Sequence, residues 1–177
     1  MKEDPESTDE VIAVSLHDAA WLDDCADLEA RARAAVAATL RHLDIGHPLE
    51  VSLLFTDDAE QRGLNRDWRS KDKPTNVLSF PNMDEEAWKA APERPQLLGD
   101  VVLARETVTR EAAAQGKTLA DHAMHLVVHG TLHLLGYDHE EAAEAVEMED
   151  LERAILAELG IADPYADEAS LAEAGHG

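Results

Sequence analysis

Cysteine is almost absent from this sequence. Cys25 is the only cysteine in 177 residues, so no disulfide can form within the chain, as is usual in a reducing compartment. The sequence also lacks an apolar run of the roughly 18 residues that a transmembrane helix requires. Its first ten residues, MKEDPESTDE, are acidic, whereas a signal peptide would be basic and then apolar. We therefore expect a cytoplasmic protein without a membrane segment.

Basic residues are scarce as well. The 15 Lys and Arg are outnumbered by 38 Asp and Glu, which gives a net charge of -23. Such a charge disfavours a nucleic-acid partner, because phosphate backbones attract basic surfaces. However, residues 1–10 and 140–177 together carry -15 of this charge, and the segment 62–73 carries a local +3. The potential near a binding site matters more than the total, so an RNA partner is not excluded.

The pattern of apolar residues predicts one α+β domain. Strand patterns fall at residues 11–16, 50–55, 77–80 and 98–103. Helical patterns fall at 24–43 (capped by Asp23 or Asp24), 57–68, 105–115, 118–135 and 140–159. Residues 11–160 would then form a single domain in which helices cover a small, mixed, four-stranded sheet. The acidic lead 1–10 and the acidic tail 161–177 would lie outside it and fray.

Two segments of this pattern carry finer predictions. The segment 82–96 contains two prolines and no clear period, so we expect a loop or an excursion there. In the last helix, the 3.6-residue period predicts an inward face. This face comprises Val146, Met148, Leu151, Ile155 and Leu159.

The segment HGTLHLLGYDH, residues 129–139, carries three histidines with distinct spacings. His129 and His133 lie four residues apart, on one face of a helix, and can bind the same metal ion. Gly136 follows the last apolar residue, where glycine commonly ends a helix and reverses the chain. His139 can then return to the same ion from the loop. The segment predicts a central metal-binding helix.

Three histidine ligands leave one coordination position open, as in catalytic zinc sites. The offsets match the metzincin motif H-E-x-x-H-x-x-G-x-x-H, but Gly130 replaces the glutamate that those proteases use as general base. We therefore expect the metal site without the protease chemistry.

Two further histidines lie earlier on the same helical face. A trio of His125, His129 and His133 is conceivable, but His125 and His133 are two turns, about 12 Å, apart along the axis. We interpret His125 as a group that supports the ligands or faces the substrate, and His122 as structural.

A basic loop precedes the third strand pattern in WRSKDKPTNVLSFP, residues 68–81. Arg69 offers a planar guanidinium that matches two phosphate oxygens, and Lys71 and Lys73 follow it. Ser79 and Asp100 interrupt apolar strands, so each could face the cleft or form a hydrogen bond at the end of its strand.

These three segments, HGTLHLLGYDH, WRSKDKPTNVLSFP and LGDVVLA, together closely resemble the bacterial YbeY family of zinc-dependent endoribonucleases. The resemblance covers residues 68–139. It implies zinc on His129, His133 and His139, a functional arginine at Arg69, and a small α+β domain with a cleft between the metal and the basic loop.

The resemblance also implies an activity and partners. It indicates single-strand-specific cleavage of RNA in ribosome quality control and in maturation of small-subunit ribosomal RNA, at the 3′ end of the 16S molecule. It also implies that an Era-type GTPase and a small-subunit ribosomal protein are partners. Asn76 stands where many members have Asp, and Trp68 stands where Tyr is common.

The expected mechanism is phosphodiester cleavage assisted by one zinc ion, which can lower the pKa of a bound water to about 7. Arg69 and Lys71 would hold the phosphate, with Ser79 as a further substrate contact, and His125 or Asp138 are candidate proton acceptors. The RNA's own phosphate is another candidate proton acceptor, and its 2′-hydroxyl is an alternative nucleophile. Two rival functions remain: a noncatalytic ribosome-assembly factor with structural zinc, and a zinc peptidase or amidase.

Overall fold

The computed structural model describes residues 12–45, 48–90, 96–138 and 141–165. The expected lead 1–10 and most of the expected tail therefore lie outside the described residues, as does His139. Within the described residues, no helix has the length and apolar character needed to cross a membrane.

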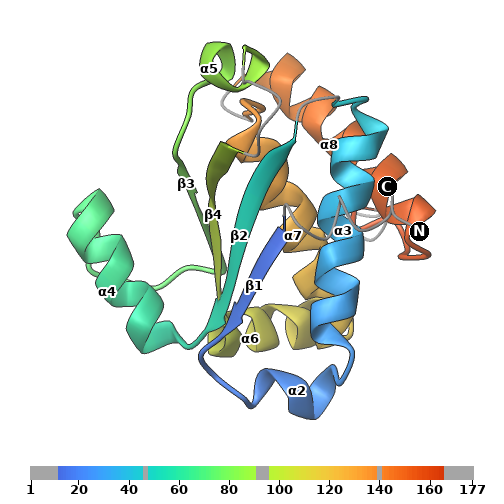
Figure 1. The fold of residues 1–177 in the computed structure, drawn as a ribbon. Coiled ribbons are helices and arrows are strands. Elements are labelled where there is room, and N and C mark those ends of the chain that lie inside the picture. Colours follow the sequence, from blue (N-terminus) through green and yellow to red (C-terminus); the bar gives the residue numbers. More distant parts are fainter. Residues whose placement is uncertain (1–11, 46–47, 91–95, 139–140, 166–177) are drawn as a thin grey trace, which may run out of the picture.

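Four strands form one mixed sheet in the order β1-β2-β4-β3 (Figure 1). β1 (Ile12–Leu16), β2 (Leu49–Thr56) and β4 (Gln96–Ala104) run parallel, and β3 (Val77–Pro81) pairs antiparallel with β4 at one edge. The prediction of a mixed four-stranded sheet in an α+β domain is confirmed.

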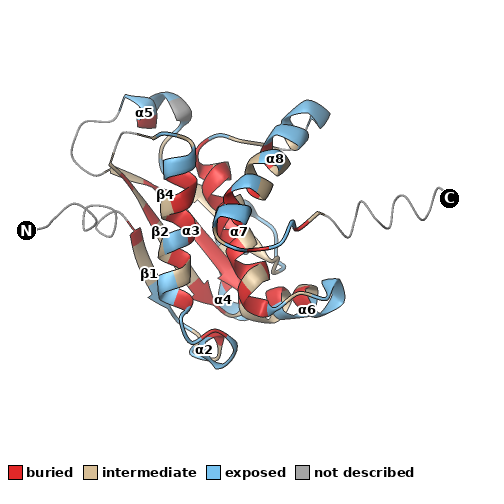
Figure 2. Ribbon diagram, turned by 90° about the vertical axis from the view of Figure 1, so that its right-hand side faces the viewer, coloured by how far each residue is buried: buried red, intermediate tan, exposed pale blue. Residues whose placement is uncertain are grey.

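Helices cover the two faces of the sheet unequally. α3 (Leu28–His42), α7 (Leu119–Leu134) and α8 (Ala142–Glu158) lie on one side, whereas α4 (Asp58–Arg69) lies on the other. α6 (Arg105–Gln115) lies at one end of the sheet, with the short α2 (Trp21–Asp24) nearby (Figure 1). The core lies between the sheet and the three-helix side, where α7 is buried along much of its length (Figure 2).

Side-chain alternation in the strands assigns each residue to one face. Val101 and Leu103 of β4 are fully buried on the side of α7, whereas Asp100 and Val102 face α4. The two faces therefore carry different chemistry.

Several sequence expectations are wrong in detail. Asp23 and Asp24 belong to α2 and do not cap the long helix, which starts after Asp27. The segment 82–96 contains a short helix, α5 (Glu85–Lys89), because the Asp84 carboxylate accepts a hydrogen bond from the Ala87 N–H at 2.8 Å. Val146 is 57% exposed, although we expected it to face inward.

The expected tail begins with packed residues. Ile161 lies in the hydrophobic core, and Tyr165 reaches back to α7 and α8 through its hydroxyl. Residues 161–165 thus extend the folded domain beyond the boundary expected at residue 160.

Candidate metal and phosphate site

α7 positions two of the three predicted metal ligands. Its N-cap is Thr118, whose hydroxyl accepts a hydrogen bond from the Asp121 N–H at 3.0 Å. Gly136, just beyond the helix, has a φ of 107°, a left-handed conformation that glycine adopts without strain. Both features match the boundaries expected from the sequence.

His129 and His133 face each other at their Nε2 atoms, which lie 3.2 Å apart. Two ligands of one tetrahedral zinc ion, each about 2.0–2.1 Å from the metal, would be about 3.4 Å apart. The two imidazoles therefore fit a shared metal ion. Among the described residues no group of three potential ligands is found, and the third predicted ligand, His139, is outside them.

A buried carboxylate fixes the orientation of these rings. His129 Nδ1 lies 2.6 Å from Glu152 Oε2, to which it can donate a hydrogen bond, and its Nε2 faces His133. A second carboxylate hydrogen bond, from His125 Nε2 to Glu152 Oε1, is 2.8 Å long. A carboxylate behind a ligating histidine is common in metal sites, where it sets the tautomer and raises ligand basicity.

Glu152 is fully buried, and its charge is stabilised by its neighbours. Burial raises the pKa of this carboxyl, but the hydrogen bonds from His125 and His129 outweigh burial and bring the pKa to about 2. Tyr165 also donates its hydroxyl hydrogen bond to the same carboxylate. Sequence analysis missed Glu152, although a signal exists: it lies on the apolar face of α8, between Met148 and Ile155.

Gly130, beside the first histidine, faces the sheet. A methyl group there would lie 2.7 Å from Val101 Cγ1 and 3.1 Å from Ser79 Oγ. Real Cβ atoms essentially never come as close as the first of these distances, so Val101 would have to move. The position that carries the general base in metzincins therefore has no room for a carboxylate in this protein.

The basic loop follows α4 and is held by buried polar side chains. Gln61 donates to the Val102 carbonyl at 3.1 Å and accepts from the Thr75 N–H at 2.8 Å. Asn65 donates to the Lys73 carbonyl at 2.8 Å. The helix ends at Ser70, which has a left-handed φ of 60°. These contacts fix the turn that presents Arg69.

Arg69 shares a pocket with the two histidines. The pocket has a volume of about 350 Å³. We call it the histidine pocket; it is lined by Arg69, Asn76, Val77, Leu78, Ser79, Pro81, His129 and His133. Arg69 donates a hydrogen bond to the Ser79 carbonyl, and its guanidinium carbon lies 5.2 Å from the centre of the Phe80 ring. A cation and two metal-binding nitrogens thus line one cavity.

Three further residues that the sequence predicts for the site, Ser79, Lys71 and His125, differ in where they lie relative to the histidine pocket. Ser79 lines the histidine pocket, but its hydroxyl donates to the Gly130 carbonyl at 3.2 Å. Lys71 is exposed in the loop after α4 and does not line the histidine pocket. His125 lines a neighbouring pocket that it shares with His129 and Tyr165. Its catalytic role and the roles of Lys71 and Ser79 stay predictions.

His122 has the surroundings expected of a structural residue. It is 3% exposed, and its Nε2 lies 2.9 Å from Glu111 Oε1. Burial lowers the pKa of this imidazole, and the hydrogen bond to Glu111 only partly offsets the effect. Asn76 donates to the same carboxylate oxygen at 2.9 Å, so Glu111 connects α7 to the start of β3.

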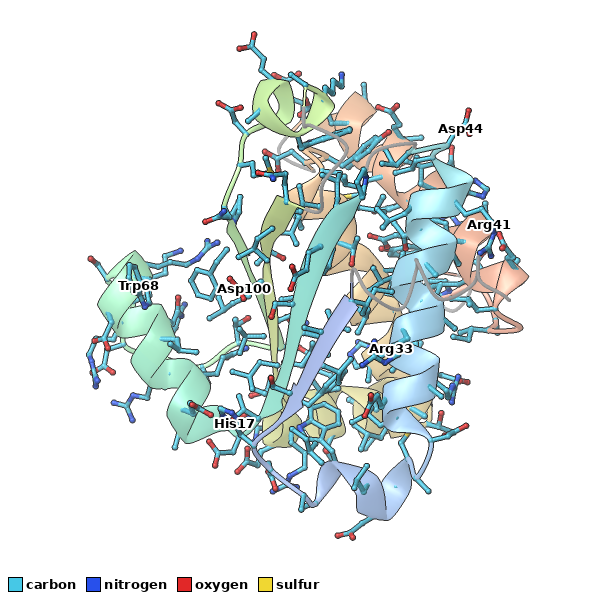
Figure 3. All side chains as sticks on the ribbon, viewed as in Figure 1. His17, Arg33, Arg41, Asp44, Trp68 and Asp100 are labelled. Atoms are coloured by element: carbon cyan, nitrogen blue, oxygen red, sulfur yellow. The ribbon has the colours of Figure 1, made fainter. Side chains whose placement is uncertain are left out.

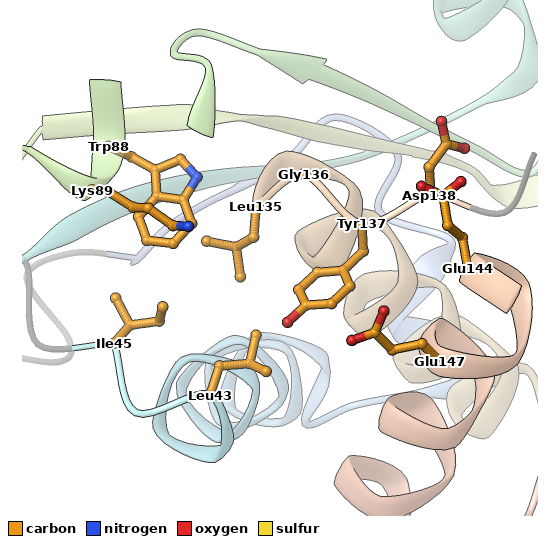
Figure 4. A pocket seen from close by; sticks show the side chains of 10 residues that line it. All are labelled: Leu43, Ile45, Trp88, Lys89, Leu135, Gly136, Tyr137, Asp138, Glu144 and Glu147. Carbon is orange, nitrogen blue, oxygen red and sulfur yellow. The ribbon is translucent and has the colours of Figure 1, made fainter. Parts of the chain in front are cut away.

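A separate pocket of about 500 Å³ lies beside the chain segment that follows α7 (Figure 4). Asp138 and Glu144 appear on one side of it in this view, and Trp88, Leu43 and Ile45 on the other. Asp138, a candidate proton acceptor, therefore lines this pocket and not the histidine pocket.

Comparison with known proteins identifies the family. The sequence model of the family described as Endoribonuclease YbeY matches residues 17–160. A protein of that name from Paramagnetospirillum magneticum is 54% identical over 158 residues, which cover 89% of this chain and 96% of the relative. Another, from Rhodospirillum rubrum, is 66% identical over 122 residues, which cover 69% of this chain and 61% of the relative.

A solved structure supports the fold. The solution structure of TM1509 from Thermotoga maritima superposes with a TM-score of 0.55, covering 90% of this chain and 92% of that one at 24% identity. The family match spans both the basic loop and α7. The chain belongs to the YbeY endoribonuclease family.

Proposed function

We propose that this protein is a metal-dependent endoribonuclease that cleaves single-stranded RNA during maturation of the 16S ribosomal RNA 3′ end and in ribosome quality control. The observation that carries the proposal is the histidine pocket, in which Arg69 and two histidines with adjacent Nε2 atoms line the same cavity. The relatives' name, Endoribonuclease YbeY, supports the same reaction class.

The proposed metal is one zinc ion held by His129, His133 and His139. Bound zinc would supply Lewis acidity toward a phosphate oxygen and would lower the pKa of a coordinated water. Glu152 keeps the His129 ring in the tautomer that offers Nε2 as a ligand. The chain's own contribution is therefore a pair of imidazoles whose Nε2 atoms face each other at the end of the pocket.

Arg69 would bind the scissile phosphate. Its guanidinium is exposed at the pocket, and its hydrogen bond to Ser79 and its position over Phe80 restrict where it can point. A guanidinium fork pairs with two phosphate oxygens and stabilises charge that grows on them during cleavage. Lys71 would add positive charge near the entrance, and the carbonyl of Ser79 would keep the arginine in place.

The rival functions differ in what they require. A peptidase of the metzincin kind needs a carboxylate beside the first histidine, and the packing of Gly130 against Val101 leaves no space for one. A noncatalytic assembly factor needs a zinc ion for folding but no phosphate-binding arginine. The partners implied by the resemblance, an Era-type GTPase and a small-subunit ribosomal protein, and a cytoplasmic location stay expectations.

Substitution of Arg69 tests the proposed reaction. Arg69→Ala should reduce cleavage of single-stranded RNA by about 10²- to 10³-fold, because the phosphate loses its positioned donor. Zinc content and the far-ultraviolet circular dichroism spectrum should not change, since Arg69 is exposed. Arg110→Ala, which removes an exposed arginine from α6, is the matched control. Wild-type cleavage rates in Arg69→Ala would favour the noncatalytic rival.

Substitution of the histidines tests the metal separately. His133→Ala and His139→Ala should each lose stoichiometric zinc, measured by elemental analysis of purified protein. His42→Ala, on α3 and far along the chain from the site, should retain it. Full zinc content in both ligand variants would overturn the assignment. RNA incubated with wild-type protein should be cleaved only without chelator; identical products with chelator would indicate a contaminating nuclease.

A further inference from the structure

A second cavity lies on the opposite side of Arg69, between α4 and the exposed face of the sheet. It has a volume of about 630 Å³ and is lined partly by apolar side chains, including Leu54 and Leu64. We call it the α4 groove. Arg69 and Pro81 line both this groove and the histidine pocket, so the two cavities adjoin at the proposed phosphate ligand.

The groove carries two aromatic side chains next to the guanidinium. Trp68, at the end of α4, is 74% exposed, and Phe80 lies under Arg69. The other tryptophans, Trp21 and Trp88, are 0% and 6% exposed. Aromatic faces beside a cation are the elements with which proteins bind unpaired nucleobases.

A carboxylate lies on the same face of the sheet. Asp100 of β4 stands opposite Phe80 of β3 in the antiparallel register, and both line the groove. Burial raises the pKa of Asp100, and a hydrogen bond with Ser52 only partly offsets this. In Figure 3 the labelled Asp100 lies on the sheet and faces α4, whose end carries the labelled Trp68.

We propose that the α4 groove binds a nucleobase of the single-stranded RNA next to the phosphate held by Arg69, with Trp68 as stacking platform and Asp100 as hydrogen-bond acceptor. This inference rests on the proposed function, because it places the base beside the proposed phosphate site. A base has a flat apolar face for Trp68 and Phe80, and the amino group of cytosine can donate to a carboxylate.

The charge of the groove's rim fits the same occupant. The segment 62–73 carries a net +3, although the chain as a whole carries -23. Arg62 and Arg66 form ion pairs with Asp72, whereas Arg69 is directed to the Ser79 carbonyl and the Phe80 ring. An RNA strand would therefore meet the Arg69 guanidinium at the point where the two cavities join.

Tryptophan fluorescence can test stacking directly, because Trp68 is the one exposed tryptophan of the three. Zinc-loaded full-length protein would be titrated with a 2′-O-methyl oligocytidylate and with an abasic strand of the same length. We expect quenching by the first strand only. Trp68→Ala should weaken binding of oligocytidylate about tenfold, the low-to-middle range for one stacked base, and should not change binding of the abasic strand.

The control for Trp68→Ala is a variant at an exposed apolar residue outside the groove. Val146→Ala, which removes another exposed apolar side chain, should bind both strands like wild type. The proposal that the groove binds a base is wrong if Trp68→Ala and wild type bind oligocytidylate with equal affinity. It is also wrong if wild type binds neither strand. If the groove binds bases as expected but zinc-loaded wild type leaves ordinary RNA intact, the proposed nuclease function is wrong. The proposal that the groove binds a nucleobase is then still supported.

Asp100→Asn tests the acceptor without changing side-chain size. Asparagine keeps a neutral carbonyl acceptor but loses the charge, which strengthens such a bond about twofold in energy, so affinity for oligocytidylate should fall by up to about tenfold. Affinity for oligouridylate should change less. Asp44→Asn makes the same substitution on the far side of the molecule and should change neither (Figure 3). An equal effect of Asp100→Asn on both strands would remove Asp100 from the proposal.

Discussion

Glu152 shows how much one buried residue can determine at this site. An isolated buried carboxylate would cost several kcal/mol, so it is stable only because its oxygens accept hydrogen bonds from His125, His129 and Tyr165. The direction of these bonds also determines which nitrogen of His129 faces His133 and would bind a metal. Glu152 therefore acts on the metal through His129 and is a positioning residue.

Glu152→Gln should weaken zinc binding about 10- to 100-fold, the range for loss of a group that orients a metal ligand. The glutamine amide can accept from only one histidine and presents a donor to the other, so the two rings can no longer both be held as they are by the carboxylate. The measurement is competition for zinc against a coloured chelator. Glu147→Gln makes the same change at an exposed position of α8 and should retain wild-type affinity. Equal zinc affinity in both variants would contradict a positioning role.

Among the helices, α7 is the one whose position determines the site. It packs against β3 and β4 on the sheet side, and at Gly130 even an added methyl group would lie too close to Val101 and Ser79. Close packing here places His129 and His133 at the edge of the sheet, where Arg69 reaches from the other face. The distance between metal ligands and arginine thus depends on a residue without a side chain.

Gly130→Ala should lower the free energy of unfolding by about 1–3 kcal/mol, because the added methyl group overpacks a filled interface. Denaturation by urea measures this change. Gly63→Ala on α4 is the matched control: its methyl group would meet only Arg66 Nη2, at 3.7 Å. There alanine should be neutral or stabilising by up to about 1 kcal/mol, since it favours the helix. Equal stability of the two variants would show that α7 can shift away from the sheet.

The sequence predicted those elements whose determinants are local. The spacing of His129 and His133, the cap at Thr118 and the stop at Gly136 all follow from one helix and its ends. Glu152 was missed because it meets the histidines only after α8 packs on α7, more than twenty residues later in the chain. The α4 groove was missed for the same reason, since it combines side chains from α4, β3 and β4. Local periodicity carries no information on such contacts.

At the scale of the whole molecule, the core does not depend on the proposed metal. Most of its buried residues come from the sheet and from α3, α7 and α8, and neither His129 nor His133 belongs to it. A zinc ion would instead stabilise the folded protein by preferential binding, by about 2.7 kcal/mol at a free concentration 100 times its Kd. A structural zinc site, as the noncatalytic rival requires, would be needed for folding itself.

Chelation of zinc should therefore lower the melting temperature without unfolding the protein. For a chain of this size, about 2.7 kcal/mol corresponds to about 5–11 °C. The far-ultraviolet circular dichroism spectrum at 25 °C should stay native while RNA cleavage is lost. His133→Ala, which already lacks a ligand, should show no further shift with chelator. Loss of the native spectrum on chelation would mean that the ion holds the fold together, and the separation of core and site inferred from the packing would be wrong.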